Sequence, residues 1–202
     1  MAVRRRPHPW LEPALLTGAL TPLVVILGRA VAGTLGANPI AQALNQLGLL
    51  ALVFLIAALA CTPLKLVFGW TWPLRVRRTL GLIGFGYACL HVATYGGLDQ
   101  LFDWRAIWKD VSKRKFIFVG FAAFLTLIPL ARTSTNDAVR RLGFARWKRL
   151  HRLAYVAPAL GALHFYWRVK KDVTEPLAYA AVLTVLLAIR LVQGLRRHGA
   201  AA

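Results

Sequence analysis

The chain alternates between long apolar runs and short basic stretches. Six runs of 16 to 21 residues are apolar enough to be membrane spans, since a helix needs about 20 such residues to cross a bilayer. They cover residues 13–32, 44–64, 79–98, 116–131, 150–167 and 176–195. None alternates with the period of two that a transmembrane barrel requires, and a helix satisfies its own backbone hydrogen bonds in lipid. The pattern predicts an all-α integral membrane protein, a six-helix bundle in which residues 1–202 form a single domain.

The six runs differ in strength. The clearest contains residues 47–61, which include no charged side chain. The run 116–131 is short. The run 150–167 is interrupted by polar residues and a proline, namely His151, Arg152, Pro158 and His164. These two spans are therefore the weakest of the six.

The N-terminal run has two interpretations. Arginines at positions 4–6, an apolar run and the small residues 30–32 are together typical of a cleaved signal peptide. An uncleaved first span is favoured, because Arg29 lies beside the candidate cleavage site. In addition, Pro13 and Pro22 interrupt a run that is already long for a signal peptide.

Composition agrees with a membrane protein. Hydrophobic residues make up 58% of the chain and the mean hydropathy is +0.55, whereas soluble domains are about 45–50% apolar. This excludes a disordered chain, which would be poor in apolar residues. A disulfide scaffold is also excluded, because Cys61 and Cys89 both lie inside apolar runs.

The net charge of +19 would by itself suggest a nucleic-acid partner. The distribution of the charge gives another explanation. If the N-terminus is cytoplasmic, 17 of the 26 basic residues fall on the cytoplasmic side with only two acids, Glu12 and Asp137. This asymmetry follows the positive-inside rule and predicts that both termini are cytoplasmic. We therefore expect the lipid bilayer, and no nucleic acid, as a partner.

Three of the five histidines lie inside the predicted spans, where ionisable residues are costly and are candidates for function. His91 follows Arg78 by 13 residues, and His164 follows His151 by 13 residues, which is about 20 Å along a helix. His91 and His164 should therefore lie at one depth, near the outer face. His151 should lie near the inner face, level with Arg77 and Arg78. His8 and His198 lie in polar tails and are given no role.

Facing imidazoles on neighbouring helices are a known way to bind a haem iron axially. The alternative for each histidine is a buried, hydrogen-bonded side chain without a ligand. The apolar runs contain no Asp or Glu, which argues against a zinc or di-iron site and against a carboxylate proton relay. The chain also has no glycine-rich phosphate motif after a strand, so a nucleotide-dependent step would need a separate protein.

Two features of the histidine spans leave alternatives open. On an ideal helix, 13 residues turn His164 about 220° away from His151, so the two share a face only if Pro158 distorts the helix. Small residues precede both outer histidines, at positions 81, 84, 86 and 88 and at positions 157, 159, 161 and 162. They suit either a flat macrocycle or ordinary helix packing.

Several motifs resemble a known family over nearly the whole chain. The most specific is Trp147-x-x-Leu150-His151-Arg152-Leu153-x-Tyr155 with His164-x-Tyr166-Trp167. Others are Arg77-Arg78-x-Leu80-Gly81-Leu82 before Tyr87 and His91, Thr133-Ser134, Arg141-Leu142-Gly143, Gly36-x-Asn38-Pro39 and Thr62-Pro63-Leu64. The sequence resembles the haem-binding membrane subunits of periplasmic methionine sulfoxide reductase systems, the MsrQ (YedZ) family. This family lies within the ferric reductase-like transmembrane superfamily, which includes the NADPH oxidases.

The resemblance implies a multi-pass protein of the bacterial inner membrane that carries haem b and, by family, FMN. It implies electron flow from the quinone pool or a cytoplasmic flavin reductase to a periplasmic molybdopterin subunit that reduces methionine sulfoxide in oxidised proteins. His91, His151 and His164 match the family's histidines and are the expected iron ligands. The wider superfamily has four histidines in two pairs, whereas Arg77 or Arg78 stands opposite His151 here. Either arginine would then hold haem propionates or a flavin phosphate.

The sequence thus predicts an electron-transfer subunit rather than the catalytic subunit of an oxidoreductase. Its outer loops, residues 99–115 and 168–175, are the expected docking surface for the reductase. Two other functions fit the same intramembrane histidines. One is a small transporter or proton channel without a cofactor, and the other is a stand-alone transmembrane metal-ion reductase.

Overall fold

The computed structural model describes residues 10–199, and within them the chain forms helices and no strand. Arg4–Arg6 and His8 lie outside this part, as does the side chain of His198. The long helices are α1 (Leu11–Val31), α2 (Pro39–Phe68), α3 (Pro73–Thr94), α5 (Lys115–Arg132), α8 (Leu153–Arg168) and α9 (Thr174–Gly199). The shorter elements are the π-helical η1 (Tyr95–Asp99), α4 (Trp104–Lys113), α6 (Asn136–Leu142) and α7 (Phe144–Leu150). The prediction of an all-α protein is confirmed.

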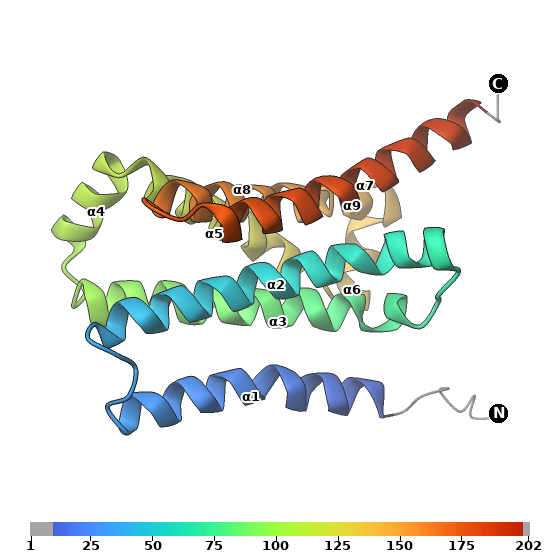
Figure 1. Cartoon of the computed structure of the whole chain (residues 1–202). Coiled ribbons are helices and arrows are strands. Elements are labelled where there is room, and N and C mark those ends of the chain that lie inside the picture. The colour runs from blue at the N-terminus through green and yellow to red at the C-terminus, as the bar shows by residue number, and fades with distance from the viewer. Residues whose placement is uncertain (1–9, 200–202) are drawn as a thin grey trace.

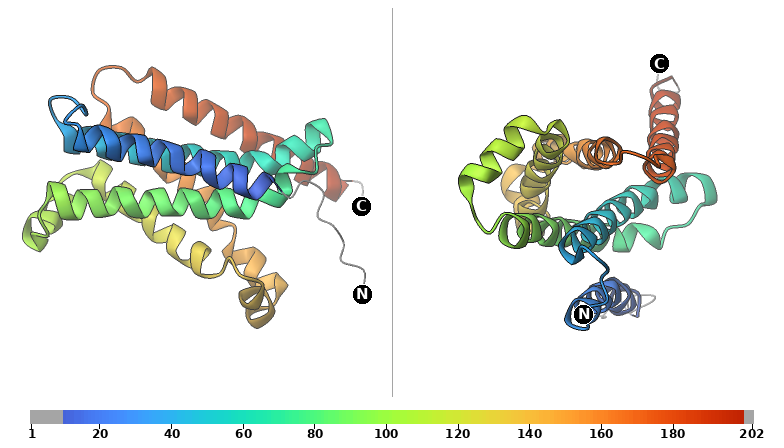
Figure 2. Two further views of the ribbon diagram at one scale, coloured as in Figure 1. Left: turned by 90° about the horizontal axis from the view of Figure 1, so that it is seen from below. Right: turned by 60° about the vertical axis from the view of Figure 1, so that its left-hand side comes forward.

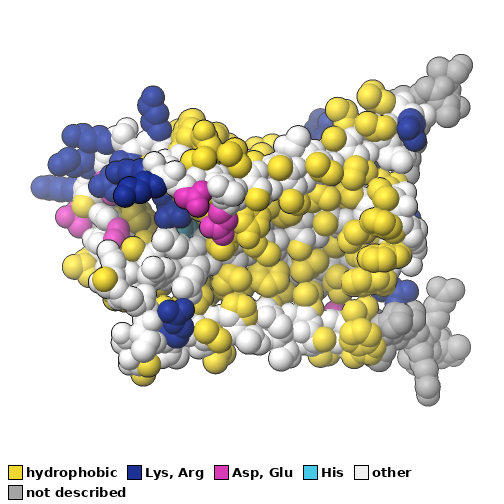
Figure 3. Space-filling model, viewed as in Figure 1, with side chains coloured by type: hydrophobic (Ala, Val, Ile, Leu, Met, Phe, Trp, Pro, Cys, Tyr) yellow, Lys and Arg dark blue, Asp and Glu magenta, His cyan; other side chains and the backbone are white. Residues whose placement is uncertain are grey.

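Four helices, α1, α2, α5 and α9, are long and apolar enough to cross a membrane. The protein is therefore a multi-pass membrane protein. The other two long helices do not meet this description: α3 begins with a turn rich in arginine, and α8 has only 16 residues. Many large apolar side chains are exposed, and Figure 3 shows hydrophobic side chains covering the middle of the face in view, with most of the charged side chains on this face at the end where α4 lies.

Local sequence explains where the helices start and stop. The side chain of Asn38 accepts a hydrogen bond from the Ala41 amide and caps α2, whose first residue is Pro39, a favoured position for proline. Gly69 ends α2 in the left-handed conformation, with φ +73°, which glycine adopts without steric cost. Asp103 caps α4 by accepting hydrogen bonds from the amides of Arg105 and Ala106.

The helices α2, α3, α5 and α8 form the centre of the bundle, while α1 and α9 lie at its periphery (Figures 1 and 2). The main core cluster joins residues from α1, α2, α3, α5 and α8, among them Leu47, Tyr87 and Ala157. The hydroxyl of Tyr87 donates a hydrogen bond to the carbonyl of Ala19, and its ring stacks on Phe54 with centroids 5.5 Å apart. Tyr87 therefore fixes the outlying α1 to the centre.

Three expected spans have different boundaries in the structure. The span expected at 44–64 is longer at both ends and runs from Pro39 to Phe68. The span expected at 79–98 begins six residues earlier, at Pro73, and its last turn is the π-helical η1. The span expected at 150–167 begins at Leu153, so His151 lies in the turn between α7 and α8. The regions expected to be loops also contain α4, α6 and α7. A search for apolar runs of about 20 residues does not detect such short, charged helices, and so the number of helices was underestimated.

Candidate functional site

The structure brings His91 of α3 and His164 of α8 together between the four central helices, near the C-terminal ends of α3 and α8 and the N-terminal ends of α2 and α5. Their ring centroids are 6.2 Å apart and their planes are almost perpendicular, at 81°. The depth argument from the sequence therefore correctly placed these two side chains at one level. Their spacing is the central geometric fact of the site.

Each of these imidazoles contacts a backbone carbonyl on a neighbouring helix. Nδ1 of His91 lies 2.9 Å from the carbonyl oxygen of Leu44, and Nδ1 of His164 lies 2.6 Å from that of Phe116. Because a carbonyl only accepts, Nδ1 carries the proton in both neutral rings. The lone pair is then on Nε2, the nitrogen that remains available for a metal.

A glycine lies one helical turn beyond each of these carbonyls. A Cβ atom at Gly48 would lie 3.1 Å from Nδ1 of His91, and a Cβ atom at Gly120 would lie 2.6 Å from Nδ1 of His164. The two rings therefore occupy the space of the missing side chains, with the Nδ1 edge against the helix. The same arrangement occurs twice. A carbonyl and a glycine of α2 contact the histidine of α3, and a carbonyl and a glycine of α5 contact the histidine of α8.

Sequence reasoning missed Gly48 and Gly120 and considered other glycines. A Cβ atom at Gly81 or Gly86 would meet nothing within 4 Å. One at Gly84 would lie 3.0 Å from the side chain of Leu55, which is ordinary close packing of α3 on α2. Each of these glycines follows by four residues the position whose carbonyl contacts a histidine. This spacing can be recognised only when it is known which helix packs against which histidine.

The geometry fits two axial ligands of one metal ion. Bonds of about 2.0–2.1 Å from a metal to each imidazole nitrogen, with about 1.1 Å from a ring atom to the ring centre, separate two axial imidazoles by roughly 6.3 Å. The observed 6.2 Å agrees with this distance. Among the described residues no group of three His, Cys, Asp or Glu side chains could hold a metal ion. The donor set thus suits a haem iron, whose four other ligands come from the macrocycle.

His151 lies apart from this pair, in the turn after α7. Its Nε2 is 3.0 Å from the Thr133 hydroxyl, which donates its own proton to the carbonyl of Pro129, so the ring nitrogen is the donor to Thr133. The ring stacks on Trp147 with centroids 4.0 Å apart. Burial lowers the pKa of His151; the contact with Thr133 partly opposes this, and the charge of Arg77 lowers the pKa again. The imidazole is therefore neutral near pH 7.

The structure separates the two arginines that the sequence treated together. Arg77 is half-buried and its Nη1 lies 3.4 Å from the Thr62 hydroxyl of α2, whereas Arg78 is exposed. Arg77 is also close enough to His151 to influence it electrostatically. Of the two predicted cofactor-binding arginines, Arg77 is the one that points into the bundle.

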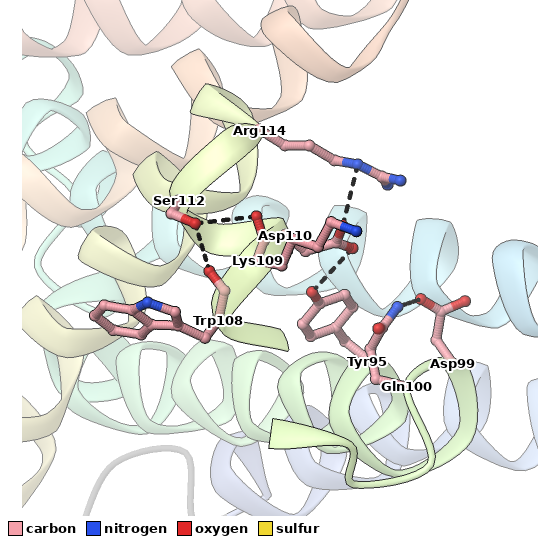
Figure 4. Close-up of polar contacts among 8 residues, drawn as sticks. All are labelled: Tyr95, Asp99, Gln100, Trp108, Lys109, Asp110, Ser112 and Arg114. Atoms are coloured by element: carbon pink, nitrogen blue, oxygen red, sulfur yellow. Dashed lines mark hydrogen bonds and ion pairs between the residues drawn. The ribbon is translucent and has the colours of Figure 1, made fainter. Parts of the chain in front are cut away.

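The other end of the site is covered by polar contacts. Arg168, one turn after His164, donates a hydrogen bond to Asn45 of α2. Close by, η1 and α4 are tied together through Asp110, which accepts from the Tyr95 hydroxyl at 3.4 Å and pairs with Arg114 at 3.4 Å (Figure 4). These contacts hold α4 against the end of the bundle and leave one of its faces free.

Comparison with known proteins identifies the family of the chain. Residues 43–162 match the family model described as the ferric reductase like transmembrane component, and the chain belongs to that class. It is 54% identical over 185 residues to the "Protein-methionine-sulfoxide reductase heme-binding subunit MsrQ" of Rhodospirillum rubrum, covering 92% of this chain and 89% of the relative. The protein of the same name from Deinococcus radiodurans is 52% identical over 192 residues, covering 95% and 94%. The chain is thus a member of the MsrQ family. No solved structure matches it significantly.

Proposed function

We propose that this protein is a haem b electron conduit that passes electrons across a bacterial inner membrane to a periplasmic methionine sulfoxide reductase. The observation that supports it best is the His91–His164 pair, whose ring centroids are 6.2 Å apart with both Nδ1 atoms held by carbonyls. The relatives' name, heme-binding subunit, agrees with this proposal. A transporter with histidine proton relays would not need two imidazoles spaced for one metal ion.

In this proposal Nε2 of His91 and Nε2 of His164 would hold the haem iron. When bound, the haem supplies reversible one-electron chemistry at a potential that its axial ligands help to set. The carbonyls of Leu44 and Phe116 orient the two rings and keep the proton on Nδ1. Gly48 and Gly120 let the rings approach the helix backbones closely enough to do so.

Six spans and cytoplasmic termini complete the proposal. The helix α3 runs beside α2, and α8 runs beside α5 (Figure 1). We therefore count α3 and α8 as spans together with α1, α2, α5 and α9. The basic ends of α2, α3 and α7 then face the cytoplasm. Electrons enter there, near His151 and Arg77, from the quinone pool or a cytoplasmic flavin reductase, with FMN as an additional carrier by family resemblance.

The opposite end, residues 99–115 and 168–175, is the proposed docking surface for a molybdopterin reductase subunit of the periplasm. On α4, Trp104 and Trp108 are 73% and 75% exposed, and Arg105 and Lys109 lie exposed beside them. Tryptophan and arginine are enriched at protein interfaces. The anchoring contacts in Figure 4 would present this face in a fixed orientation.

The visible spectrum of the purified protein tests the proposal. We expect a Soret band, reducible α and β bands and loss of the absorbance of this haem in His91→Ala and His164→Ala. Full haem content in both variants would refute the ligand assignment, and a colourless wild type after haem-replete expression would favour the transporter. A coloured protein that reduces metal ions and does not bind a periplasmic reductase would instead be a stand-alone metal-ion reductase.

A further inference from the structure

Arg190 lies on α9 directly after the apolar residues 185–189, and the sequence indicates no role for it beyond membrane topology. Its guanidinium reaches back into the bundle, where Nη1 donates to the Tyr155 hydroxyl at 2.9 Å and Nη2 donates to the Leu59 carbonyl at 2.5 Å. Its Nε is buried and has no hydrogen-bond partner. A charged side chain that faces the interior of a membrane bundle and has an unpaired donor costs free energy. A ligand that accepts a hydrogen bond from this donor would reduce the cost.

Arg77 adds a second positive charge at the same place. It contacts Thr62, one helical turn beyond Leu59 on α2, so that both guanidiniums lie on the same stretch of that helix. The two guanidiniums lie close enough to repel each other, and both influence Cys61, which lies between Leu59 and Thr62 in the sequence of α2. Neither forms an ion pair with a carboxylate in the described part of the chain.

The neutral partners satisfy hydrogen bonds, and the guanidinium of Arg190 also lies over the Tyr155 ring, 5.3 Å from its centroid, but none of these groups carries a negative charge. A phenol and a carbonyl can orient Arg190, yet two guanidiniums side by side in a low-dielectric bundle still repel. An anion between them removes this repulsion and gives the free Nε an acceptor. The arrangement is therefore that of a binding site for an oxyanion, built by α2, α3, α8 and α9.

We propose that Arg190 and Arg77 together bind an anionic oxygen group of a cofactor on the inner side of the bundle, either a porphyrin carboxylate or a flavin phosphate. The inference rests on the proposed function, because electrons would enter at this end beside His151. It extends that function by assigning Arg190 as a ligand-binding residue and by giving the chemical class of what it binds. Tyr155 and the Leu59 carbonyl are positioning groups, since they hold the guanidinium of Arg190.

Matched ligand pairs test the proposal on the full-length protein in lipid nanodiscs. Haemin is compared with haemin dimethyl ester, which lacks the carboxylates, and FMN with riboflavin, which lacks the phosphate. For the ligand pair that the site recognises, the wild type should prefer the charged member. Arg190→Gln and Arg77→Gln should each reduce this preference by about 10- to 100-fold, the usual effect of losing a charge-assisted hydrogen bond. An effect on the haemin pair identifies the carboxylate, and an effect on the FMN pair identifies the phosphate.

Arg78→Gln is the matched control, because it removes the same charge from an exposed neighbour and should leave both preferences unchanged. Tyr155→Phe should lower the preference less than Arg190→Gln does, since the charge remains. If Arg190→Gln does not purify as a folded protein, Arg77→Gln provides the same comparison. Unchanged preferences in both arginine variants, with haem still bound, would overturn this inference but not the proposed function. A wild type that binds no haemin would overturn the proposed function, and an Arg190-dependent FMN preference would still support the oxyanion site.

Discussion

A Cβ atom on Gly120 would lie only 2.6 Å from Nδ1 of His164. The ring therefore occupies the place where any other residue of α5 would have its side chain. This contact keeps Nδ1 on the Phe116 carbonyl and turns the opposite edge of the ring into the bundle. A glycine with no chemistry of its own is thus required for the orientation of a proposed iron ligand.

Gly120→Ala should displace His164 and remove most of the haem. A helical Gly→Ala change normally stabilises by about 0.5–1 kcal/mol, but overpacking here should cost about 1–3 kcal/mol. The haem-to-protein ratio and the melting temperature of the purified variant measure both effects. Gly86→Ala, where a Cβ meets nothing within 4 Å, is the control and should keep its haem. Normal haem content in Gly120→Ala would contradict this role of the glycine.

Gly48→Ala should have a milder effect than Gly120→Ala. Its Cβ would lie 3.1 Å from the ring of His91, so the ring must shift by only a few tenths of an ångström. We expect weaker haem binding than in the wild type and stronger binding than in Gly120→Ala, measured by titrating haemin into the apoprotein. The reverse order of the two variants would show that these contacts do not determine how the haem is held.

His151→Ala should slow electron entry and leave the outer haem in place. His151 bonds to Thr133 and stacks on Trp147, and it makes no contact with the His91–His164 pair. Stopped-flow reduction with a cytoplasmic-side donor should be slower in the variant, while the haem spectrum stays that of the wild type. An unchanged reduction rate would remove His151 from the electron path.

Trp104→Ala and Trp108→Ala should weaken binding of the periplasmic reductase subunit. Each ring is largely exposed on α4, and loss of an interface tryptophan typically costs about 2 kcal/mol, roughly 30-fold in Kd. Biolayer interferometry with nanodisc-embedded protein measures this. Trp70→Ala, at the other end of the bundle, is the control. Equal affinities for all three variants and the wild type would place the docking surface elsewhere.

Tyr87→Phe should loosen α1 without changing the haem. The variant loses one hydrogen bond to the Ala19 carbonyl, which is worth about 0.6–1.5 kcal/mol between membrane helices. A lower unfolding midpoint with an unaltered visible spectrum is expected. A changed spectrum would mean that α1 helps to shape the haem site.

The class of fold and the approach of His91 to His164 could be predicted from the sequence. Both predictions use hydropathy and helical rise, which can be read from each helix separately. It could not predict Gly120 or Gly48, since their importance depends on which helix faces which histidine. The break before Leu153 was missed for a similar reason. His151 and Arg152 continue a helical pattern in sequence, whereas in the structure the chain turns there and His151 contacts Thr133. Arg190 looked like a topology signal until its contacts with Leu59 and Tyr155 placed it inside the bundle.

The two carbonyl contacts would also affect the reduction potential of a haem held by these histidines. A hydrogen bond from Nδ1 to Leu44 or Phe116 makes the imidazole a stronger electron donor to a metal. Stronger donation from both histidines would stabilise ferric over ferrous iron and would lower the reduction potential. A haem held in this way would be a ready reductant, which is what a subunit that passes electrons outward requires.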